Sequence, residues 1–197
     1  MWLVALLPLW VIRYNVNHYK MKLKIKVKIF PGSSKIELSE KGDCIDLRAA
    51  EDITLEAPYA NALHKSKQER RRYVEFDRAT VPLGVAMQLP KGMKANLIPR
   101  SSINKEGGVF QMIQSNSPGC VDNCYCGPND QWFMPIMSVG KVEIKKGDRI
   151  CQFEIQPSMK ATAWQKIKWL LSSGVELDFV DELDNPDRGG HGSTGVK

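Results

Sequence analysis

Three cysteines, an aspartate and a tyrosine lie between glycines in the stretch GCVDNCYCGPND, residues 119–130. Its chemistry has three interpretations. Thiolates at Cys120, Cys124 and Cys126 could join a zinc site, which would need a fourth ligand from elsewhere, or the thiols could form a disulfide staple. In the third interpretation, the stretch is a hairpin that presents an aspartate and a tyrosine to a ligand.

Three further segments carry groups suited to anion chemistry. LIPRSS places Arg100, Ser101 and Ser102 after strand-like residues, and a guanidinium matches phosphate oxygens bidentately. GDRICQF predicts a turn leading into a strand that carries Gln152, although a salt-bridged turn is the simpler interpretation of this segment alone. Asp46 in CIDLRA is an acidic residue in a predicted strand, where such residues are depleted, and therefore needs an explanation.

The C-terminal segment DRGGHGSTGVK is rich in glycine and is expected to be a flexible tail. Three of its glycines match the spacing G-x-G-x-x-G of a dinucleotide-binding turn. That motif needs a strand before it and a helix after it, and the context here offers neither, so we reject a Rossmann interpretation. Arg188, Ser193 and Thr194 then lie on a backbone able to wrap an anion; a solvated end is the alternative.

Short β-branched segments between Gly and Pro recur along the chain and predict a mainly β, antiparallel sandwich or barrel. The first, MKLKIKVKIF from Met21, alternates lysine with apolar residues. The other expected strands are KIEL, CIDLRA, ATVPLGVAMQL, KANLIP, GVFQMIQSN, WFMPIMSV, KVEI and DRICQFEIQP. Helical periodicity is found at 62–76 and at 161–174, the second with Gly174 as its stop.

Bulk composition indicates one globular domain, because 197 residues with 43% hydrophobic content can bury one sizeable core. The net charge of +6 suits a polyanionic partner, and its spread over several segments fits a small phosphorylated ligand as well as nucleic acid. Five cysteines without a clear secretory signal favour reduced thiols in a cytoplasm. The apolar run Trp2–Ile12 is too short to span a membrane. Residues 1–20 are expected to be an over-extended start of the gene model or a disordered leader, and Met21 to be the functional start of a single domain, 21–197.

Five segments follow one another in the order CIDLRAAEDI, PRSS, NSPGCVDNCYCG, GDRICQ and DRGGHGSTG. This order resembles the five motifs of the trimeric dUTP diphosphatase (dUTPase) family, and YCGPNDQW is most similar to its bacterial and phage branch. The resemblance covers residues 25–197. It implies a jelly-roll-like β-barrel subunit with a small helical minority, a homotrimer with active sites shared between subunits, and Mg²⁺-dependent hydrolysis of dUTP to dUMP and pyrophosphate. The stretch 119–130 is then the substrate-binding hairpin, with its cysteines as packing residues.

The resemblance implies a role for each matched position. Asp122 would orient and deprotonate the attacking water, Asn116 would read uracil and Tyr125 would pack beneath the deoxyribose. Asp46 would lie near the water shell of the metal. The tail, 187–197, would close over the triphosphate from a neighbouring subunit. The positions expected to contact the phosphates or to close over the nucleotide are Arg100, Ser101, Ser102, Gln152, Arg188, His191, Gly192 and Ser193.

The sequence departs from the family pattern at three places. The family usually has Ala-Gly-x-Asp where Asp43 to Asp46 stand here, so the turn before the metal-shell aspartate differs. The segment 56–77, which contains KQERRR, is longer than the usual connection and is interpreted as an insertion: a solvated excursion, or an arm that binds a protein partner or nucleic acid. His191 stands where many relatives carry a phenylalanine that stacks on uracil.

Two other function classes remain open. A dCTP deaminase has a similar fold, but its water-activating residue is a glutamate, and the aspartate at position 122 with the intact tail argues against it. A dUTPase-like regulator would bind a protein partner through 56–77 and use the nucleotide as its switch. We expect dUTP as the ligand, no stable nucleic-acid complex and no membrane association.

Overall fold

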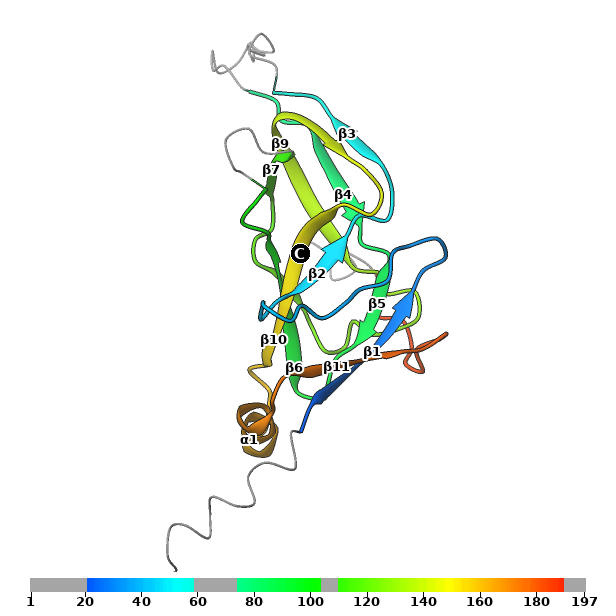
Figure 1. The fold of residues 1–197 in the computed structure, drawn as a ribbon, viewed down its shortest axis with the longest axis vertical. Helices are drawn as coiled ribbons and strands as arrows, with labels where there is room; N and C mark the ends of the chain where they lie inside the picture. Colours follow the sequence, from blue (N-terminus) through cyan, green and yellow to red (C-terminus); the bar gives the residue numbers. More distant parts are fainter. Residues whose placement is uncertain (1–20, 59–73, 104–109, 190–197) are drawn as a thin grey trace, which may run out of the picture.

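The structure, a computed structural model, describes residues 21–58, 74–103 and 110–189 (Figure 1). The expectations for the leader 1–20, for most of the helix at 62–76, and for His191, Gly192 and Ser193 fall outside these ranges. The described elements, in chain order, are β1 (Leu23–Ile29), β2 (Ile45–Arg48), β3 (Ile53–Leu55), β4 (Arg78–Pro82), β5 (Val85–Gln88), β6 (Met93–Pro99), β7 (Phe110–Gln114), β8 (Gly119–Val121), β9 (Phe133–Ile144), β10 (Arg149–Pro157), α1 (Ala163–Leu171) and β11 (Val175–Phe179).

The strands pair into three sheets with the orders β11-β1-β5, β2-β10-β6-β8 and β3-β9-β4, and β7 also pairs with β9. The pairs are antiparallel apart from β1 and β11, which are parallel. The prediction of a mainly β, antiparallel fold is confirmed. None of these sheets closes on itself among the described strands, and the arrangement is consistent with the jelly-roll-like subunit that the resemblance implies.

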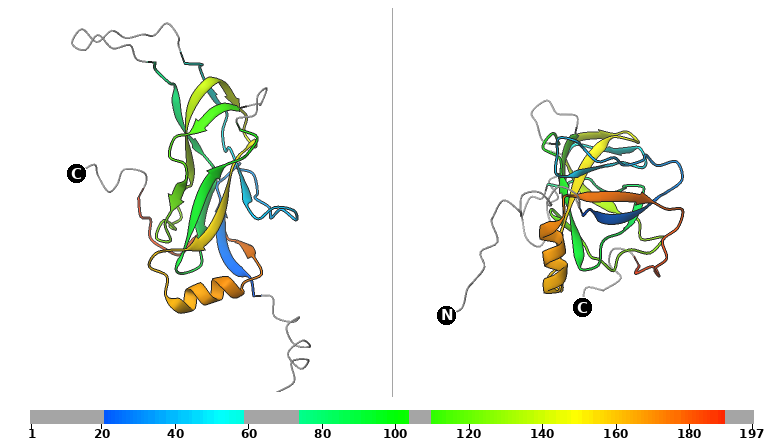
Figure 2. Two further views of the ribbon diagram at one scale, coloured as in Figure 1. Left: turned by 90° about the vertical axis from the view of Figure 1, so that its left-hand side faces the viewer. Right: turned by 60° about the horizontal axis from the view of Figure 1, so that its bottom comes forward.

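The first strand follows its alternating sequence. Ile25 and Val27 are fully buried, and their neighbours Lys26 and Lys28 point the other way. Lys28 forms an ion pair with Glu182, and Lys26 with a second acidic residue of the same C-terminal segment. The two ends of the described fold therefore lie side by side, with β11 beside β1 (Figures 1 and 2).

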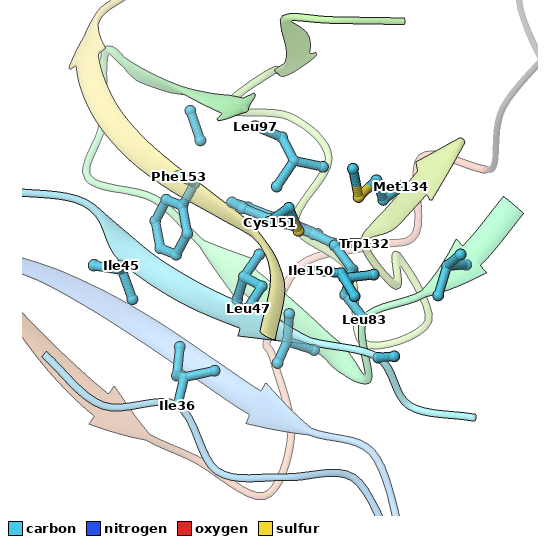
Figure 3. Packing of buried hydrophobic residues seen from close by; sticks show 14 of the residues in the cluster. Ile36, Ile45, Leu47, Leu83, Leu97, Trp132, Met134, Ile150, Cys151 and Phe153 are labelled. Atoms are coloured by element: carbon cyan, nitrogen blue, oxygen red, sulfur yellow. The ribbon is translucent and has the colours of Figure 1, made fainter. Parts of the chain in front are cut away.

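The core fixes the sheet that carries β10. Trp132 places its ring edge-on to Phe153, with 5.1 Å between ring centroids, and Cys151 is buried beside them (Figure 3). Because side chains alternate along a strand, Gln152, which lies between Cys151 and Phe153 on β10, faces the opposite side of the sheet. Apolar packing on one face thus holds a polar side chain at a defined place on the other.

The helix predicted over 161–174 is confirmed with shorter bounds, as α1. Thr162 caps its first turn, since its hydroxyl accepts from the Gln165 N–H while the Gln165 side chain accepts from the Thr162 N–H. The apolar side chains of α1 are largely exposed, Leu170 at 70% of its surface. Within the described ranges, no helix has the length and apolar character needed to cross a bilayer.

Some strand predictions differ from the structure. WFMPIMSV and KVEI form one continuous strand, β9, and ATVPLGVAMQL is divided by Gly84 into β4 and β5. KIEL is not a strand, although Ile36 is buried in the core. The strands β3 and β8 have three residues each, too few to show an alternating pattern, and pairing with a longer neighbour defines them. The strand β11, with the alternating sequence VELDF, was missed although its pattern is typical of a strand.

Candidate active site

Four polar side chains meet where β2, β10 and β6 lie side by side. Gln152 of β10 is opposite Asp46 of β2 on one side and a β6 residue on the other. The Asp46 carboxylate pairs with Arg100 Nε at 3.0 Å through one oxygen and with Arg149 Nη1 at 3.2 Å through the other. We call Asp46, Arg100, Arg149 and Gln152 the Asp46 cluster. It brings together three of the positions predicted from sequence, and Arg149 was missed.

The two arginines of this cluster lie at strand ends: Arg100 follows the last residue of β6, and Arg149 is the first residue of β10. β6 ends at Pro99, so Arg100 begins a turn that the Ile103 N–H closes onto its carbonyl at 3.1 Å. Ser101 and Ser102 lie in this turn, directly after Arg100 in the chain. Two guanidiniums around one carboxylate leave excess positive charge at this edge, which suits the oxygens of a phosphate.

The connection between β7 and β8 carries Asn116. The Gln114 side chain, only 3% exposed, donates from Nε2 to Asn116 Oδ1 at 3.2 Å and to the Leu97 carbonyl at 3.1 Å. With its oxygen engaged, the Asn116 amide presents its NH₂ group to a ligand. Gly119 keeps this space open, because a Cβ there would lie 3.2 Å from Gln114 Nε2. The orienting role of Gln114 was missed from sequence.

The predicted hairpin needs a correction. The predicted stretch 119–130 begins with β8, which pairs with β6, and leads to β9, which pairs with β3, β4 and β7, so it joins two sheets and does not close a hairpin. The connection between β7 and β8, which carries Asn116, likewise joins two sheets. Both flanking strands are fixed in larger sheets. The loop is therefore held from two sides, which limits its freedom when a ligand enters.

Asp122 follows β8 directly and is exposed to solvent. Arg188 Nη1 lies 3.1 Å from its Oδ2, within the same chain. The turn after it is closed by the Tyr125 N–H, which donates to the Asp122 carbonyl at 3.0 Å. Tyr125 packs against the core and donates its hydroxyl to the Gln131 carbonyl at 2.8 Å. Burial, with smaller contributions from nearby carboxylates, raises the pKa of Tyr125, so the phenol remains a donor. We call Asp122, Tyr125 and Arg188 the Asp122 cluster, and we include Asn116 in it because its loop leads into β8, which ends just before Asp122.

The two clusters lie at opposite ends of β6. Val121, next to the catalytic candidate Asp122, pairs with Ala95 near the start of the strand, whereas Arg100 follows its end. The stretch from Ala95 to Arg100 covers about 16 Å at the rise of a β-strand. Of the predicted site residues that the structure describes, most therefore fall into two groups that lie at different places along β6 of one subunit.

The cysteines do not form a site. All five are free, which excludes the disulfide staple. Within the described residues, no group of three or more His, Cys, Asp or Glu side chains is placed to hold a metal ion. This result goes against the zinc interpretation for the part of the chain that is described, where all the cysteines lie. Cys151 packs in the core, while Cys120 and Cys124 are exposed.

Thiol alkylation checks this arrangement. Burial raises the pKa of the Cys151 thiol far above its ordinary value, and the thiolate is the reactive form. We expect iodoacetamide at pH 8 to modify Cys120 and Cys124 of the native protein, and to modify Cys151 at least about tenfold more slowly, the change in thiolate fraction that one pH unit produces. Peptide mass spectrometry measures both rates. Equal labelling of Cys151 before denaturation would contradict the buried position.

Comparisons with known proteins place the chain in a family. The family model described as dUTPase matches residues 48–194, and the chain belongs to this family. Among curated proteins, it is 44% identical over 176 residues to the SPbeta prophage-derived deoxyuridine 5'-triphosphate nucleotidohydrolase YosS of Bacillus subtilis (strain 168), covering 89% of this chain and 100% of that protein. A deoxyuridine 5'-triphosphate nucleotidohydrolase of Hydrogenobaculum sp. is 36% identical over 124 residues, covering 62% and 74%.

Solved structures agree in fold. The dUTPase from Streptococcus mutans gives a TM-score of 0.53 at 18% identity, covering 70% of this chain and 99% of that one. A mutant dUTPase from phage phi11 of S. aureus, described as revealing the coordination of a structural Mg(II) ion, gives 0.52 at 16% identity, covering 70% and 93%. At these identities the likeness concerns the fold.

Proposed function

We propose that this protein hydrolyses dUTP to dUMP and pyrophosphate, which supplies dUMP and limits the incorporation of uracil into DNA. The observation that carries the proposal is the Asp122 cluster: an exposed carboxylate lies beside a guanidinium at 3.1 Å, directly after β8, and the loop before β8 carries the oriented amide of Asn116. This cluster combines a proton acceptor, a cation for phosphate oxygens and a donor for a base carbonyl. Membership of the dUTPase family supports the same reaction.

Base selection follows from the oriented amide. The free NH₂ of Asn116 can donate to the 4-carbonyl of uracil, whereas the 4-amino group of cytosine would face it as a second donor. A wrong exocyclic group would leave the Asn116 amide unpaired once the substrate covers it, and this costs more than a lost methyl contact. We expect the loop, which is anchored in two sheets, to exclude the 5-methyl group of thymine when it closes on the base. Tyr125, packed on the core, offers its ring to the sugar.

The chemical step needs no covalent intermediate. The Asp122 side chain is 55% exposed, so a water molecule can reach it. In the proposed reaction, the carboxylate orients this water and accepts its proton. The water oxygen attacks the α-phosphorus in line, and the α–β phosphoanhydride bond breaks to release pyrophosphate. The Arg188 guanidinium, next to the Asp122 carboxylate, can stabilise the negative charge that develops on the phosphate oxygens.

The Asp46 cluster would bind the phosphate chain. Arg100 and Arg149 can exchange the carboxylate for phosphate oxygens, and Gln152 adds a donor. Mg²⁺ fits these residues when it is held mainly by the triphosphate, because this ion keeps several waters and commonly uses one or two carboxylates; Asp46 would reach it through water. Bound in this way, the ion would neutralise charge on the departing pyrophosphate.

A site built from two subunits follows from what each cluster contains. The Asp122 cluster carries the proposed base and the Asp46 cluster carries the arginines for the phosphate chain, and the strand between them covers about 16 Å. In a symmetric homotrimer, the Asp122 cluster of one subunit can meet the Asp46 cluster of the next, which gives three equivalent sites. This assembly accounts for two half-complete sets of residues on one chain.

Measuring pyrophosphate release with dUTP, dCTP, dTTP and UTP tests the function. We expect release from dUTP and little from the other three. Ammonia released from dCTP would indicate a deaminase and contradict the proposal. No turnover of dUTP in the presence of Mg²⁺ would contradict it as well, and would favour the regulatory alternative.

A further inference from the structure

Asp122 lies at a point where strand pairing has ended. Val121, the last residue of β8, pairs with Ala95 of β6, whereas Asp122 itself belongs to no strand. Its side chain is 55% exposed, and its ion pair with Arg188 is of the exposed kind that contributes little. A general base has to stay within hydrogen-bond reach of the water that it deprotonates. Another contact is therefore needed to hold the chain on the far side of this residue.

The side chain of Asn123 makes such a contact. Asn123 is half-buried, whereas Asp122 and Cys124 on either side of it are exposed. Its Nδ2 donates to the Pro90 carbonyl at 2.9 Å and to the Leu89 carbonyl at 3.3 Å. A side-chain amide carries two N–H donors, which match these two acceptors. The amide thereby joins the loop that carries the proposed base to the turn between β5 and β6.

The turn between β5 and β6 is itself held by the rest of the fold. The Met93 N–H donates to the Pro90 carbonyl at 2.9 Å and closes the turn. Gly92 has a φ of 80°, which glycine adopts without strain, and its carbonyl accepts from the Ser158 N–H at 2.8 Å, directly after β10. A Cβ at Gly92 would collide with the Gln165 side chain of α1. The acceptors of the amide therefore belong to a turn that other elements fix in place.

We propose that Asn123 is a positioning residue, which holds the backbone after Asp122 so that the carboxylate stays within reach of the attacking water. The proposal rests on the proposed function for the role of Asp122. Pairing of Val121 with β6 holds the main chain on one side of Asp122, and the amide of Asn123 holds it on the other. The carboxylate remains free to turn from Arg188 to a water molecule.

The expected kinetic signature is a loss in kcat. Asn123→Ala should lower kcat for dUTP about tenfold to hundredfold, the range for a displaced catalytic group. KM, and Kd for an α,β-imido analogue, should stay within about threefold, because the contacts proposed for the base and the phosphates come from other residues. Asn123→Asp keeps the shape of the side chain but replaces its donors with acceptors, and should lose at least as much. Wild-type kcat in either variant, or a loss confined to binding, would contradict the proposal.

A double-mutant cycle separates positioning from general structural damage. If Asn123 acts through Asp122, the variant Asn123→Ala/Asp122→Asn should match the residual turnover of Asp122→Asn within about twofold. Asp77→Ala is the matched control, since it removes two side-chain hydrogen bonds to backbone N–H groups, those of Glu56 and Arg78, outside both clusters. Its kcat should stay within about twofold of the wild-type value. Additive losses in the double variant, or an equal loss with Asp77→Ala, would overturn the positioning role.

Amide hydrogen exchange tests the anchor without any reaction. The Tyr125 N–H donates to the Asp122 carbonyl at 3.0 Å and so reports whether the turn after Asp122 is closed. Asn123→Ala should speed its exchange roughly tenfold, the factor that a lost hydrogen bond produces. The Ser33 N–H, which closes a distant turn onto the Phe30 carbonyl, should exchange at the wild-type rate. Unchanged exchange at Tyr125, or equal acceleration at both amides, would overturn the anchor. This result stands even if dUTP is not hydrolysed, so the anchor and the proposed function can fail separately.

Discussion

Asp122→Asn is expected to lower kcat for dUTP hydrolysis by about 10²–10⁴-fold, the usual contribution of a general base, while nucleotide binding is largely retained. The amide can still hydrogen-bond a water molecule, but it cannot accept the proton of that water. The side chain is exposed and its partner is Arg188, so the substitution should not unfold the protein. Steady-state kinetics give kcat, and calorimetry with an α,β-imido analogue of dUTP gives Kd.

A matched carboxylate serves as the control. Asp178→Asn on β11 removes the same charge from another exposed ion pair, with Lys24, outside both clusters. It should leave kcat within about twofold, as expected for a surface change away from the site. If Asp122→Asn retained more than a tenth of the turnover, Asp122 would not be the base. If the Asp122→Asn variant also failed to bind the analogue, Asp122 would have a role in binding instead.

Mixing two inactive variants should restore activity if sites are shared between subunits. Asp122→Asn damages one cluster and Arg100→Ala damages the other, so each homotrimer is inactive. In trimers refolded from equal amounts of both chains, about a quarter of the interfaces should combine two intact clusters, as cyclic symmetry requires. Activity should therefore rise from near zero to roughly a quarter of the wild-type value, and native mass spectrometry verifies that mixed trimers form.

A pair within one cluster provides the control for this mixture. Asp122→Asn and Asn116→Ala both damage the Asp122 cluster, so no arrangement of these chains yields an intact site and no activity should return. In the pair Asp122→Asn with Arg188→Ala, activity should return only if Arg188 serves the site of a neighbouring subunit. Mixed trimers of Asp122→Asn with Arg100→Ala that remain inactive would contradict the two-subunit site.

The sequence by itself identified the strands with long alternating patterns and the chemistry of the residues that follow them. Lysine alternation around Ile25 and Val27 indicated β1, because a strand with one buried face must repeat every second residue. The order of the motifs identified the family, and Arg100 and Gln152 were assigned to the phosphates from it. The strand pattern and each single motif lie within a few neighbouring residues, and those residues carry enough information to specify them.

The tertiary structure alone decided which of these residues meet. Gln114 and Asn123 lack a local signal, since each acts on a partner fixed by another strand or turn. The same holds for the split into two clusters, which depends on the register of β8 and β10 against β6. Hydrogen bonds between strands and across loops are set by long-range packing, and a sequence pattern specifies the face a side chain occupies without specifying which residue lies opposite it.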